Sequence, residues 1–351
     1  MPDKPIKLGI AGFGKSAKTF HLPILQSIPD YKIDTVLERS GNSAKEIIEN
    51  VQVVQRFDDL LKKDKVNLVL ISTPNEFHYE QASAVLSAGK HVVVEKPFTI
   101  TSDEAQHLVE LAKKMKKIVT VYQNRRWDGD FLTLQSVFND PRLGKLVELE
   151  INFNRFRNFK REGSWRESER PGSGILYDLG PHLIDQALFL LGKPDSVYAD
   201  ISCQRNESST DDNFIIHLYY PSVRVVLRAG MLVPDETPRF VLRGTEGSFV
   251  KYGMDPQEEA LKSGNHPGNS KEWGVEPQDN WGTMYAFDGG SIQIEKIKTE
   301  AGDYREFYKK LASAILEDSE PPVNPRHAKN VIEIIELAIE SSDKKIAIQP
   351  A

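Results

Sequence analysis

A glycine-rich turn near the N-terminus constrains the fold of this chain more than any other feature. The apolar run IKLGIA, residues 6–11, predicts a buried strand, and it leads directly into Gly12-Phe13-Gly14-Lys15-Ser16-Ala17. This segment fits G-x-G-x-x-[GA] between a strand and a helix: the first glycine permits a tight turn, the second lets the backbone approach a ligand, and the small last residue allows close packing. Because the helix N-terminus would face an anion, residues 12–17 are predicted to bind the pyrophosphate of a dinucleotide. A glycine turn without a ligand is the alternative.

Apolar runs and helical patterns alternate along the first third of the chain. Runs such as LVLI and HVVV are apolar on both faces, as strands of a parallel sheet covered by helices must be. Further strands are predicted at residues 32–37, 66–73, 90–96 and 118–124, and helices at 18–27, from 43, at 77–88 and at 102–114. This alternation is typical of βαβ units and predicts an α/β fold, with a doubly wound parallel sheet of the Rossmann type in residues 1–123.

The pattern changes after about residue 124. A helix is predicted at residues 174–191, followed by the strand-like segments SVYADISCQR, NFIIHLYYP, VRVVLRAGML and RFVLRGTEGSFVKY, which short polar turns connect. Neighbouring strands of this kind indicate a mostly antiparallel sheet, so residues 124–351 are predicted to form an α+β domain on a large open sheet. Residues 254–300 are rich in Gly, Pro, Asn and acidic residues and predict an irregular segment; two helices near 304–317 and 325–342 follow.

Composition excludes several classes of function. The formal charge is −6, and the one strongly basic run, residues 113–117, is typical of a solvated helix end, so no nucleic-acid partner is expected. Cys203 is the only cysteine, which excludes an internal disulfide and a thiolate metal cluster. No signal peptide and no run of about eighteen apolar residues occurs, so we expect a cytoplasmic protein without a membrane partner.

The end of the second predicted strand should meet the ribose of the adenosine, about twenty residues beyond the glycine-rich turn. Glu38 could accept hydrogen bonds from a 2′-hydroxyl, which favours NAD, whereas Arg39 and Ser40 could hold a 2′-phosphate, which favours NADP. We lean slightly to NADP because an arginine and a serine form a usual phosphate cradle. Solvated loop charges are the alternative.

Other candidate residues follow the later strands of the predicted sheet. Ligands of open parallel sheets bind beyond the carboxyl ends of the strands, which directs Lys96 toward the cofactor cleft unless it is only a snorkelling surface charge. The remaining candidate cofactor contacts near these strand ends are Thr73, Pro74, Asn75, His78, Glu95 and Gln123. His78 is also expected to begin a helix. His21 and His217 have no partner that the sequence reveals and are interpreted as structural.

The predicted helix 174–191 is mostly apolar, yet it places Asp178, His182 and Asp185 at intervals of four and three residues. Helix capping by Asp178 and a buried structural histidine are the ordinary interpretation. Together with Lys96 and the glycine-rich turn, the same residues instead indicate a catalytic site. For Asp185, positioning of another residue or substrate contact both stay open.

Taken together, the motifs resemble the Gfo/Idh/MocA family of NAD(P)-dependent sugar and polyol dehydrogenases over the whole chain. The most specific marks are Glu95-Lys96-Pro97 and GSGILYDLGPHLID, residues 172–185. FGKSAKTFHLPIL, YQNRRWDGDF and Trp165-Arg166 are similar to the branch that contains the NADP-dependent scyllo-inositol dehydrogenases. Ser173 stands where many members have glycine, and both residues are small.

The resemblance implies that Lys96, Asp178 and His182 are catalytic and that Trp165 and Arg166 approach the cofactor from the second domain. It also implies a substrate-binding second domain and a homodimer or homotetramer formed through its sheet. Chemistry supports the catalytic assignment, because alcohol oxidation needs a base such as His182 and a donor such as Lys96 at the alcohol oxygen. No zinc motif occurs, so no metal is expected.

The sequence therefore predicts an oxidoreductase that transfers a hydride between NADP or NAD and a secondary alcohol of a cyclic polyol or sugar, with an inositol as the best candidate. A nucleotide-binding sensor without turnover is the alternative of another class. A third possibility is an enzyme that uses transient oxidation to promote elimination or glycoside cleavage.

Overall fold

The computed structural model describes residues 5–161, 163–206 and 208–350. Contacts divide the chain into two units. The first contains residues 1–124, 257–273 and 303–329, and the second contains 125–256, 274–302 and 330–351. The chain thus leaves the first unit after Asn124 and returns to it twice, in segments that the predicted single boundary does not include.

Parallel strands form the centre of the first unit. They are β1 (Ile6–Ala11), β2 (Tyr31–Leu37), β3 (Gln52–Val54), β4 (Leu68–Ile71), β5 (His91–Val94) and β6 (Val119–Val121). Within the described residues they form one six-stranded sheet in the order β3-β2-β1-β4-β5-β6. All residues of β4 are buried, as expected for a strand covered on both faces. The strand order reverses between β1 and β4, which is where ligands bind in doubly wound sheets.

Helices connect these strands and cover the sheet. They are η1 (Ala17–His21), α1 (Leu22–Gln26), α2 (Ser43–Ile47), α3 (Phe57–Leu61), η2 (Asn75–Phe77), α4 (His78–Ser87) and α5 (Ser102–Met115), with α8 (Gln257–Lys262) and α9 (Arg305–Glu317) from later in the chain. α4 packs against α5, and α1 packs against α9. Helix α9 contributes buried Phe307, Tyr308 and Leu311, so the C-terminal third of the sequence completes this unit.

The second unit is built on a mostly antiparallel sheet, which confirms the predicted fold class. Its strands are β7 (Leu146–Asn152), β8 (Ser196–Ser202), β9 (Asn213–Tyr219), β10 (Arg224–Gly230), β11 (Phe240–Gly244), β12 (Gly247–Lys251), β13 (Gly282–Asp288) and β14 (Ser291–Ile297). Among the described residues the order is β14-β13-β12-β11-β7-β10-β9-β8. The β7 and β10 strands pair in parallel, and the other pairs are antiparallel.

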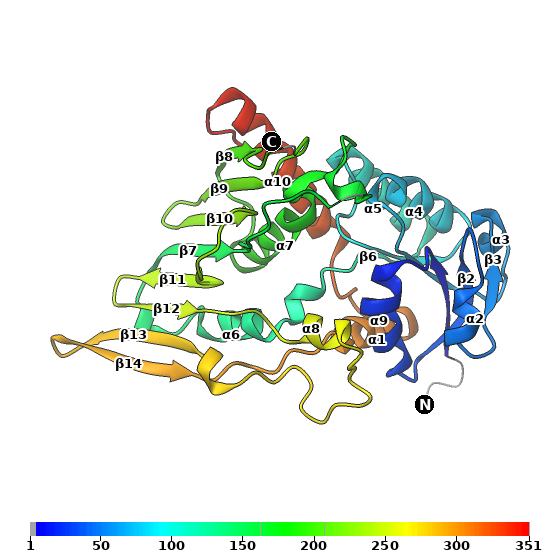
Figure 1. Cartoon of the computed structure of the whole chain (residues 1–351), viewed down its shortest axis with the longest axis horizontal. Coiled ribbons are helices and arrows are strands. Elements are labelled where there is room, and N and C mark those ends of the chain that lie inside the picture. The colour runs from blue at the N-terminus through cyan, green and yellow to red at the C-terminus, as the bar shows by residue number, and fades with distance from the viewer. Residues whose placement is uncertain (1–4, 162, 207, 351) are drawn as a thin grey trace. The chain divides into compact units, whose positions relative to one another are not determined.

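Two features of this sheet differ from expectation. The segment 254–300 was predicted to be irregular, but β13 and β14 form a hairpin at one edge of the sheet within it (Figure 1). The prediction was wrong because the Gly-, Pro- and Asn-rich stretch at residues 264–282 dominated the interpretation of the whole segment, although β14, SIQIEKI, alternates apolar and polar residues. The central strand β7 was not predicted either.

The two faces of the sheet differ in character. Helix α7 (Gly174–Leu191) packs on β7, β9 and β10. The other helical segments of this part are η3 (Asn124–Trp127), α6 (Gly129–Val137), η4 (Pro141–Leu143), η5 (Trp165–Glu167), η6 (Gln278–Asn280) and α10 (Pro325–Lys344). The opposite face of β13 and β14 leaves Phe287, Ile292 and Ile294 exposed. No helix in the described ranges has the length and apolar character needed to cross a membrane.

Candidate active site

The glycine-rich turn has the geometry that a phosphate loop needs. Gly12 has φ +92°, and a Cβ there would lie 2.8 Å from the carbonyl oxygen of Ser72, so only glycine fits. A Cβ on Gly14 would meet nothing within 4 Å, so the space in front of the loop is open. Ala17 is fully buried where the following helix meets the sheet. The geometry at Gly12, Gly14 and Ala17 fits a bound pyrophosphate. Of the other residues in the turn, Phe13 is buried and Lys15 is exposed.

Glu38, the candidate for the 2′-hydroxyl, already has partners in the protein. Its Oε1 accepts a hydrogen bond from the Ser43 hydroxyl at 2.6 Å and its Oε2 accepts one from the Ala44 backbone N–H at 3.2 Å, at the start of α2. Partial burial opposes ionisation, but these bonds and the charge of Lys18 lower the pKa of Glu38. The side chains of Arg39 and Ser40 are exposed beyond the end of β2.

The loops after β4, β5 and β6 lie at the same edge of the sheet as Gly12, because all these strands are parallel. Two buried polar atoms there, Oγ of Ser72 and Oε1 of Gln123, make no hydrogen bond within the described residues. Since buried polar atoms normally have partners, they fit a site that receives a polar ligand. Thr73 is engaged with Gln81 at 2.8 Å, Asn75 is buried, and Pro74 is half-buried.

His78 joins two of these loops. It begins α4 as predicted and is buried, with Nδ1 2.7 Å from the carbonyl oxygen of Pro97 and Nε2 3.0 Å from that of Thr73. Burial is the largest influence on its ring and lowers its pKa. These contacts support the loops on which Thr73 and Lys96 lie, and a direct cofactor contact by His78 stays a prediction.

Lys96 lies two residues after the end of β5 and is half-buried. Its backbone N–H donates to Oε2 of Glu95 at 3.1 Å, and the peptide bond between Lys96 and Pro97 is cis. Oε1 of Glu95 accepts hydrogen bonds from the Ser16 hydroxyl and from His21, so Glu95 connects the phosphate loop with the Lys96 turn. The sequence placed these residues separately and did not link His21 to either loop.

Helix α7 carries the other candidate catalytic residues, in the second unit. Asp178 and His182 lie one helical turn apart on α7, with His182 buried and Asp178 half-buried. Asp178 forms an ion pair with Arg166, Oδ1 to Nε 3.2 Å. The predicted pairing of Asp178 with Lys96 stays a prediction.

Asp185 has a defined partner in the second unit. Its two carboxylate oxygens accept hydrogen bonds from Nε and Nη2 of Arg126 at 2.8 and 2.7 Å, and both side chains are buried. The Arg126 guanidinium also lies 5.0 Å from the centre of the Phe189 ring. Of the two roles left open by the sequence, these contacts favour positioning of another residue.

The start of α7 is held by a residue that sequence reasoning missed. Oδ2 of Asp211 accepts a hydrogen bond from the Leu176 backbone N–H at 2.7 Å. A Cβ on Gly174, where φ is +87°, would clash with the same carboxylate, so Gly174 makes room for it. Burial raises the pKa of Asp211 to about 6. A sequence signal for this contact is absent, because the cap comes from 35 residues beyond Leu176.

Trp165 and Arg166 form η5, on a segment that leads into α7. The Arg166 guanidinium lies 4.6 Å from the centre of the Trp165 ring. A cavity of about 900 Å³ is lined by residues of this segment, among them Phe159, Lys160, Arg161 and Trp165. Trp165, one of the two residues expected to approach the cofactor, therefore borders a cavity of the second unit.

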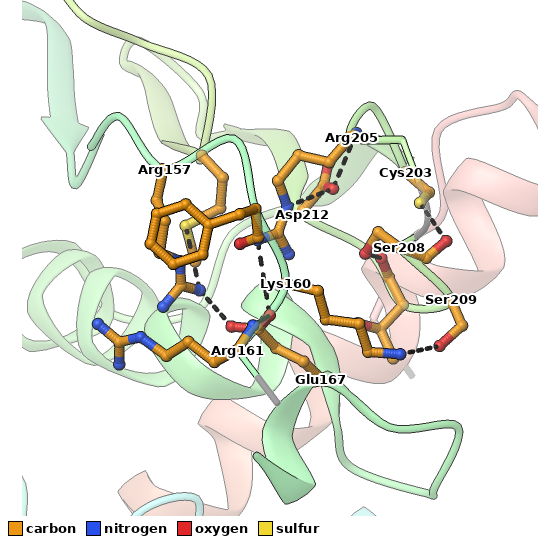
Figure 2. A network of polar contacts seen from close by, with 12 residues as sticks. Arg157, Lys160, Arg161, Glu167, Cys203, Arg205, Ser208, Ser209 and Asp212 are labelled. Carbon is orange, nitrogen blue, oxygen red and sulfur yellow. Dashed lines mark hydrogen bonds and ion pairs between the residues drawn. The ribbon is translucent and has the colours of Figure 1, made fainter. Parts of the chain in front are cut away.

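A buried network of ion pairs anchors this segment (Figure 2). Glu167 accepts from Arg157 and lies 3.5 Å from Arg205, which in turn pairs with Asp212 at 2.9 Å. Arg205 also donates to the carbonyl oxygen of Phe159 at 2.8 Å. The sequence did not identify these residues, because each looks like an ordinary solvated charge until the fold brings it to a partner.

The described part of the chain has no cluster of three His, Cys, Asp or Glu side chains that could hold a metal ion. Comparison with family models assigns both halves of the chain. Residues 6–123 match the Gfo/Idh/MocA model described as "Oxidoreductase family, NAD-binding Rossmann fold", and residues 139–349 match the model of its "C-terminal alpha/beta domain".

Individual relatives match nearly the whole chain. The scyllo-inositol 2-dehydrogenase (NADP(+)) IolW of Bacillus subtilis is 37% identical over 98% of this chain and 95% of its own length. YdgJ of Escherichia coli, an oxidoreductase whose activity is uncharacterized, is 39% identical over 98% of both chains. Among solved structures, the oxidoreductase yvaA of Bacillus subtilis superposes with a TM-score of 0.95 at 36% identity, over 99% of this chain and 98% of that chain.

Proposed function

The chain belongs to the Gfo/Idh/MocA family of oxidoreductases, and we propose that it is a dehydrogenase that transfers a hydride between NADP and a secondary alcohol of a cyclic polyol or sugar. An inositol is the proposed substrate. The single observation that carries the proposal is the position of Lys96. It lies just beyond the carboxyl end of β5, at the same edge of the parallel sheet as the Gly12 loop, which follows the carboxyl end of β1. The 37% identity to an inositol dehydrogenase over 98% of the chain supports the substrate class.

In the proposed reaction each catalytic side chain has one task. His182 takes the proton of the alcohol hydroxyl, because an imidazole exchanges protons near neutral pH. The Lys96 ammonium donates a hydrogen bond to the alcohol oxygen and stabilises the negative charge that develops there. Asp178, one helical turn before His182, orients the reacting groups. The oxidised nicotinamide, when bound, supplies the acceptor for the hydride that leaves the carbon.

Two observations support NADP over NAD. Glu38, which an NAD enzyme would use for the 2′-hydroxyl, caps α2 through Ser43 and Ala44. Arg39 and Ser40 are exposed beside it, where a guanidinium and a hydroxyl can hold a phosphate. The relative with the NADP(+) name supports the same choice.

We also propose that the protein is a homodimer or homotetramer formed through the sheet of the second unit. The outer face of this sheet exposes Phe287, Ile292 and Ile294, which are larger apolar groups than a free sheet surface usually presents together.

The function is tested by mixing the purified protein with NAD or NADP and a panel of inositols, hexoses and pentoses while reduced nicotinamide is followed. Turnover with a cyclic polyol and NADP is expected. Tight cofactor binding without turnover on any polyol would favour the nucleotide-binding sensor instead. Product analysis distinguishes simple oxidation, which yields the ketone, from transient oxidation that ends in elimination or glycoside cleavage.

A further inference from the structure

A buried series of hydrogen bonds in the first unit connects α9 with the phosphate loop. His21 is fully buried at the end of η1, with Nδ1 2.6 Å from the Tyr308 hydroxyl and Nε2 2.8 Å from Oε1 of Glu95. The same Glu95 oxygen accepts a hydrogen bond from the Ser16 hydroxyl. We call Tyr308, His21, Glu95 and Ser16 the His21 relay.

The chemistry of these groups determines which way the hydrogen bonds run. Burial, followed by the neighbouring Tyr122, Tyr31 and Glu95, raises the pKa of Tyr308 well above its usual value, so its hydroxyl stays protonated and donates a hydrogen bond to Nδ1 of His21. The ring N–H then lies at Nε2, which donates a hydrogen bond to the carboxylate of Glu95. Each donor of the His21 relay thus meets an acceptor, and the negative charge lies at Glu95.

Aromatic rings shield the His21 relay from water. The Tyr122 ring centre lies 4.2 Å from that of His21, and Phe307 packs edge-on against Tyr122 at 4.9 Å. Tyr31 adds a further ring on the α9 side, packed edge-on against Tyr308 at 5.5 Å, and its hydroxyl donates to the backbone carbonyl of Tyr308 at 2.6 Å. Breaking a hydrogen bond of the relay would leave a buried polar group without a partner, which costs free energy. The enclosure therefore keeps the relay in one arrangement.

Several charged or titratable groups face Glu95. His21 reaches it from η1, Tyr308 from α9, and His78 from α4, while Lys96 is its neighbour in the chain. Burial raises the pKa of Glu95, but the contacts with His21, the hydrogen bond from Ser16 and the charge of Lys96 lower it to about 2. Glu95 is therefore a carboxylate throughout the neutral range.

We propose that Tyr308 and His21 are positioning residues, which hold Glu95 as a carboxylate turned toward Ser16 and thereby fix the phosphate loop in the conformation that receives the cofactor. This inference rests on the proposed dinucleotide binding. Because the Ser16 hydroxyl donates to Glu95, Ser16 offers the pyrophosphate its backbone N–H rather than its side chain. The Lys96 backbone N–H bonds to the other oxygen of Glu95, so the same carboxylate also supports the Lys96 turn.

The first test removes single groups of the relay and measures NADP binding by isothermal titration calorimetry. Tyr308→Phe removes the donor to Nδ1, and His21→Leu removes both ring nitrogens at similar size. Tyr31→Phe is the matched control, because it keeps the ring and deletes a buried hydroxyl whose hydrogen bond goes to the backbone carbonyl of Tyr308 and not to a side chain of the relay. The NADP dissociation constant is expected to rise about tenfold or more in Tyr308→Phe and His21→Leu, and by less than about twofold in the control.

A second readout separates a positioning role from loss of stability. In His21→Leu the burial of Glu95 remains while one hydrogen-bond donor to it is lost, so the pKa of Glu95 should rise and NADP binding should be lost at a higher pH than in the unaltered protein as pH falls. Infrared spectra recorded as pH falls should show the protonated carboxyl at that higher pH, and this signal should be absent from the double variant His21→Leu with Glu95→Gln. His21→Gln, whose amide N–H can replace Nε2, should restore much of the binding and the ionised Glu95.

The outcomes distinguish this proposal from the proposed function. If Tyr308→Phe and His21→Leu bind NADP as tightly as Tyr31→Phe does, or if the pKa of Glu95 in His21→Leu equals that in the unaltered protein, the positioning role is wrong. If the unaltered protein binds NADP but oxidises no polyol, the dehydrogenase proposal fails and the binding data still decide the role of the relay. If it binds neither NAD nor NADP, both proposals fail. Should His21→Leu not fold, Tyr308→Phe and its control carry the comparison.

Discussion

The role of a charged side chain in this protein depends on the partner that the fold supplies. Glu38 stands at the sequence position of a ribose-binding acid, yet its carboxylate caps α2. Asp185 lies on the same helix as Asp178 and His182, yet it is paired through both oxygens with Arg126. Residue type and spacing therefore marked both residues as candidates, and only the contacts distinguish a side chain that can meet a ligand from one that supports the structure.

At this scale the catalytic assignment is tested first. Lys96→Met and His182→Ala should each lower kcat by about a hundredfold or more, because each removes a donor or a base that acts at the reacting oxygen. The dissociation constant of NADP should change little. Lys114→Met and His107→Ala, at exposed positions on α5, are the controls and should keep normal rates. A near-normal kcat in either active-site variant would contradict the catalytic role of the residue it replaces.

The cofactor preference belongs to the residue scale as well. Arg39→Ala should weaken NADP binding by about tenfold and leave NAD binding nearly unchanged, because a guanidinium gains a charge-assisted hydrogen bond only from the 2′-phosphate. Titration calorimetry with both dinucleotides measures this difference. Lys32→Ala, also exposed and on β2, the strand that precedes Arg39, is the control for a general loss of positive charge. Equal losses for NADP and NAD would show that Arg39 does not hold the phosphate.

Elements differ in how much of them could be predicted. Helix α7 begins and ends where the sequence predicts, at Gly174 and Leu191, because eighteen residues of strong apolar pattern are bounded by glycines. Strand β7 was missed because three of its seven residues are charged or polar, and Glu148 finds its partners Arg224 and Arg243 only across the sheet. The β13–β14 hairpin was missed because the Gly-, Pro- and Asn-rich stretch at residues 264–282 hid the alternation of SIQIEKI that follows it. Local pattern was sufficient for the glycine-rich turn and α7, whereas long-range pairings needed the structure.

The carboxyl group of Asp211, which holds the N-terminus of α7, should make the stability of the protein depend on pH. The pKa of Asp211 in the folded protein is raised to about 6 from an ordinary value of 3.8, so the folded state binds its proton more tightly than the unfolded state does. The free energy of unfolding should therefore fall as pH rises from about 4 to about 6, and this part of the fall should disappear in Asp211→Asn. The Asn oxygen can still accept the hydrogen bond from Leu176.

Urea unfolding across this pH range measures the difference between the two proteins. Asp200→Asn, an exposed acid on β8, is the control, because it should keep the pH dependence of the unaltered protein. Parallel curves for the unaltered protein and Asp211→Asn would mean that Asp211 has an ordinary pKa and that its burial does not govern the start of α7.

At the scale of the whole molecule, the outer face of the β13–β14 hairpin exposes large apolar side chains that are costly to leave in water. On β13 and β14, Tyr285 lies opposite Ile294, and Phe287 lies opposite Ile292, so all four side chains share the outer face of the sheet. Ile294 is 67% exposed and Phe287 is 58% exposed. Toward the centre of the sheet the same face carries the ion pairs of Glu148 with Arg224 and Arg243. A second copy of this sheet, packed face to face, could bury the apolar side chains of the hairpin and meet the charged side chains at the centre of the sheet.

We therefore expect the protein to sediment as a dimer or tetramer, and Ile294→Asp to shift it to a smaller species in sedimentation velocity experiments. A carboxylate buried in the interface would lose its hydration without gaining a partner, which costs several kcal/mol. The fold should survive, because Ile294 makes no part of the core of its own unit. Leu316→Asp, at an exposed apolar position on α9, is the control and should leave the oligomer intact. Sedimentation of Ile294→Asp identical to that of the unaltered protein would place the interface elsewhere, and a monomeric unaltered protein would contradict the assembly itself.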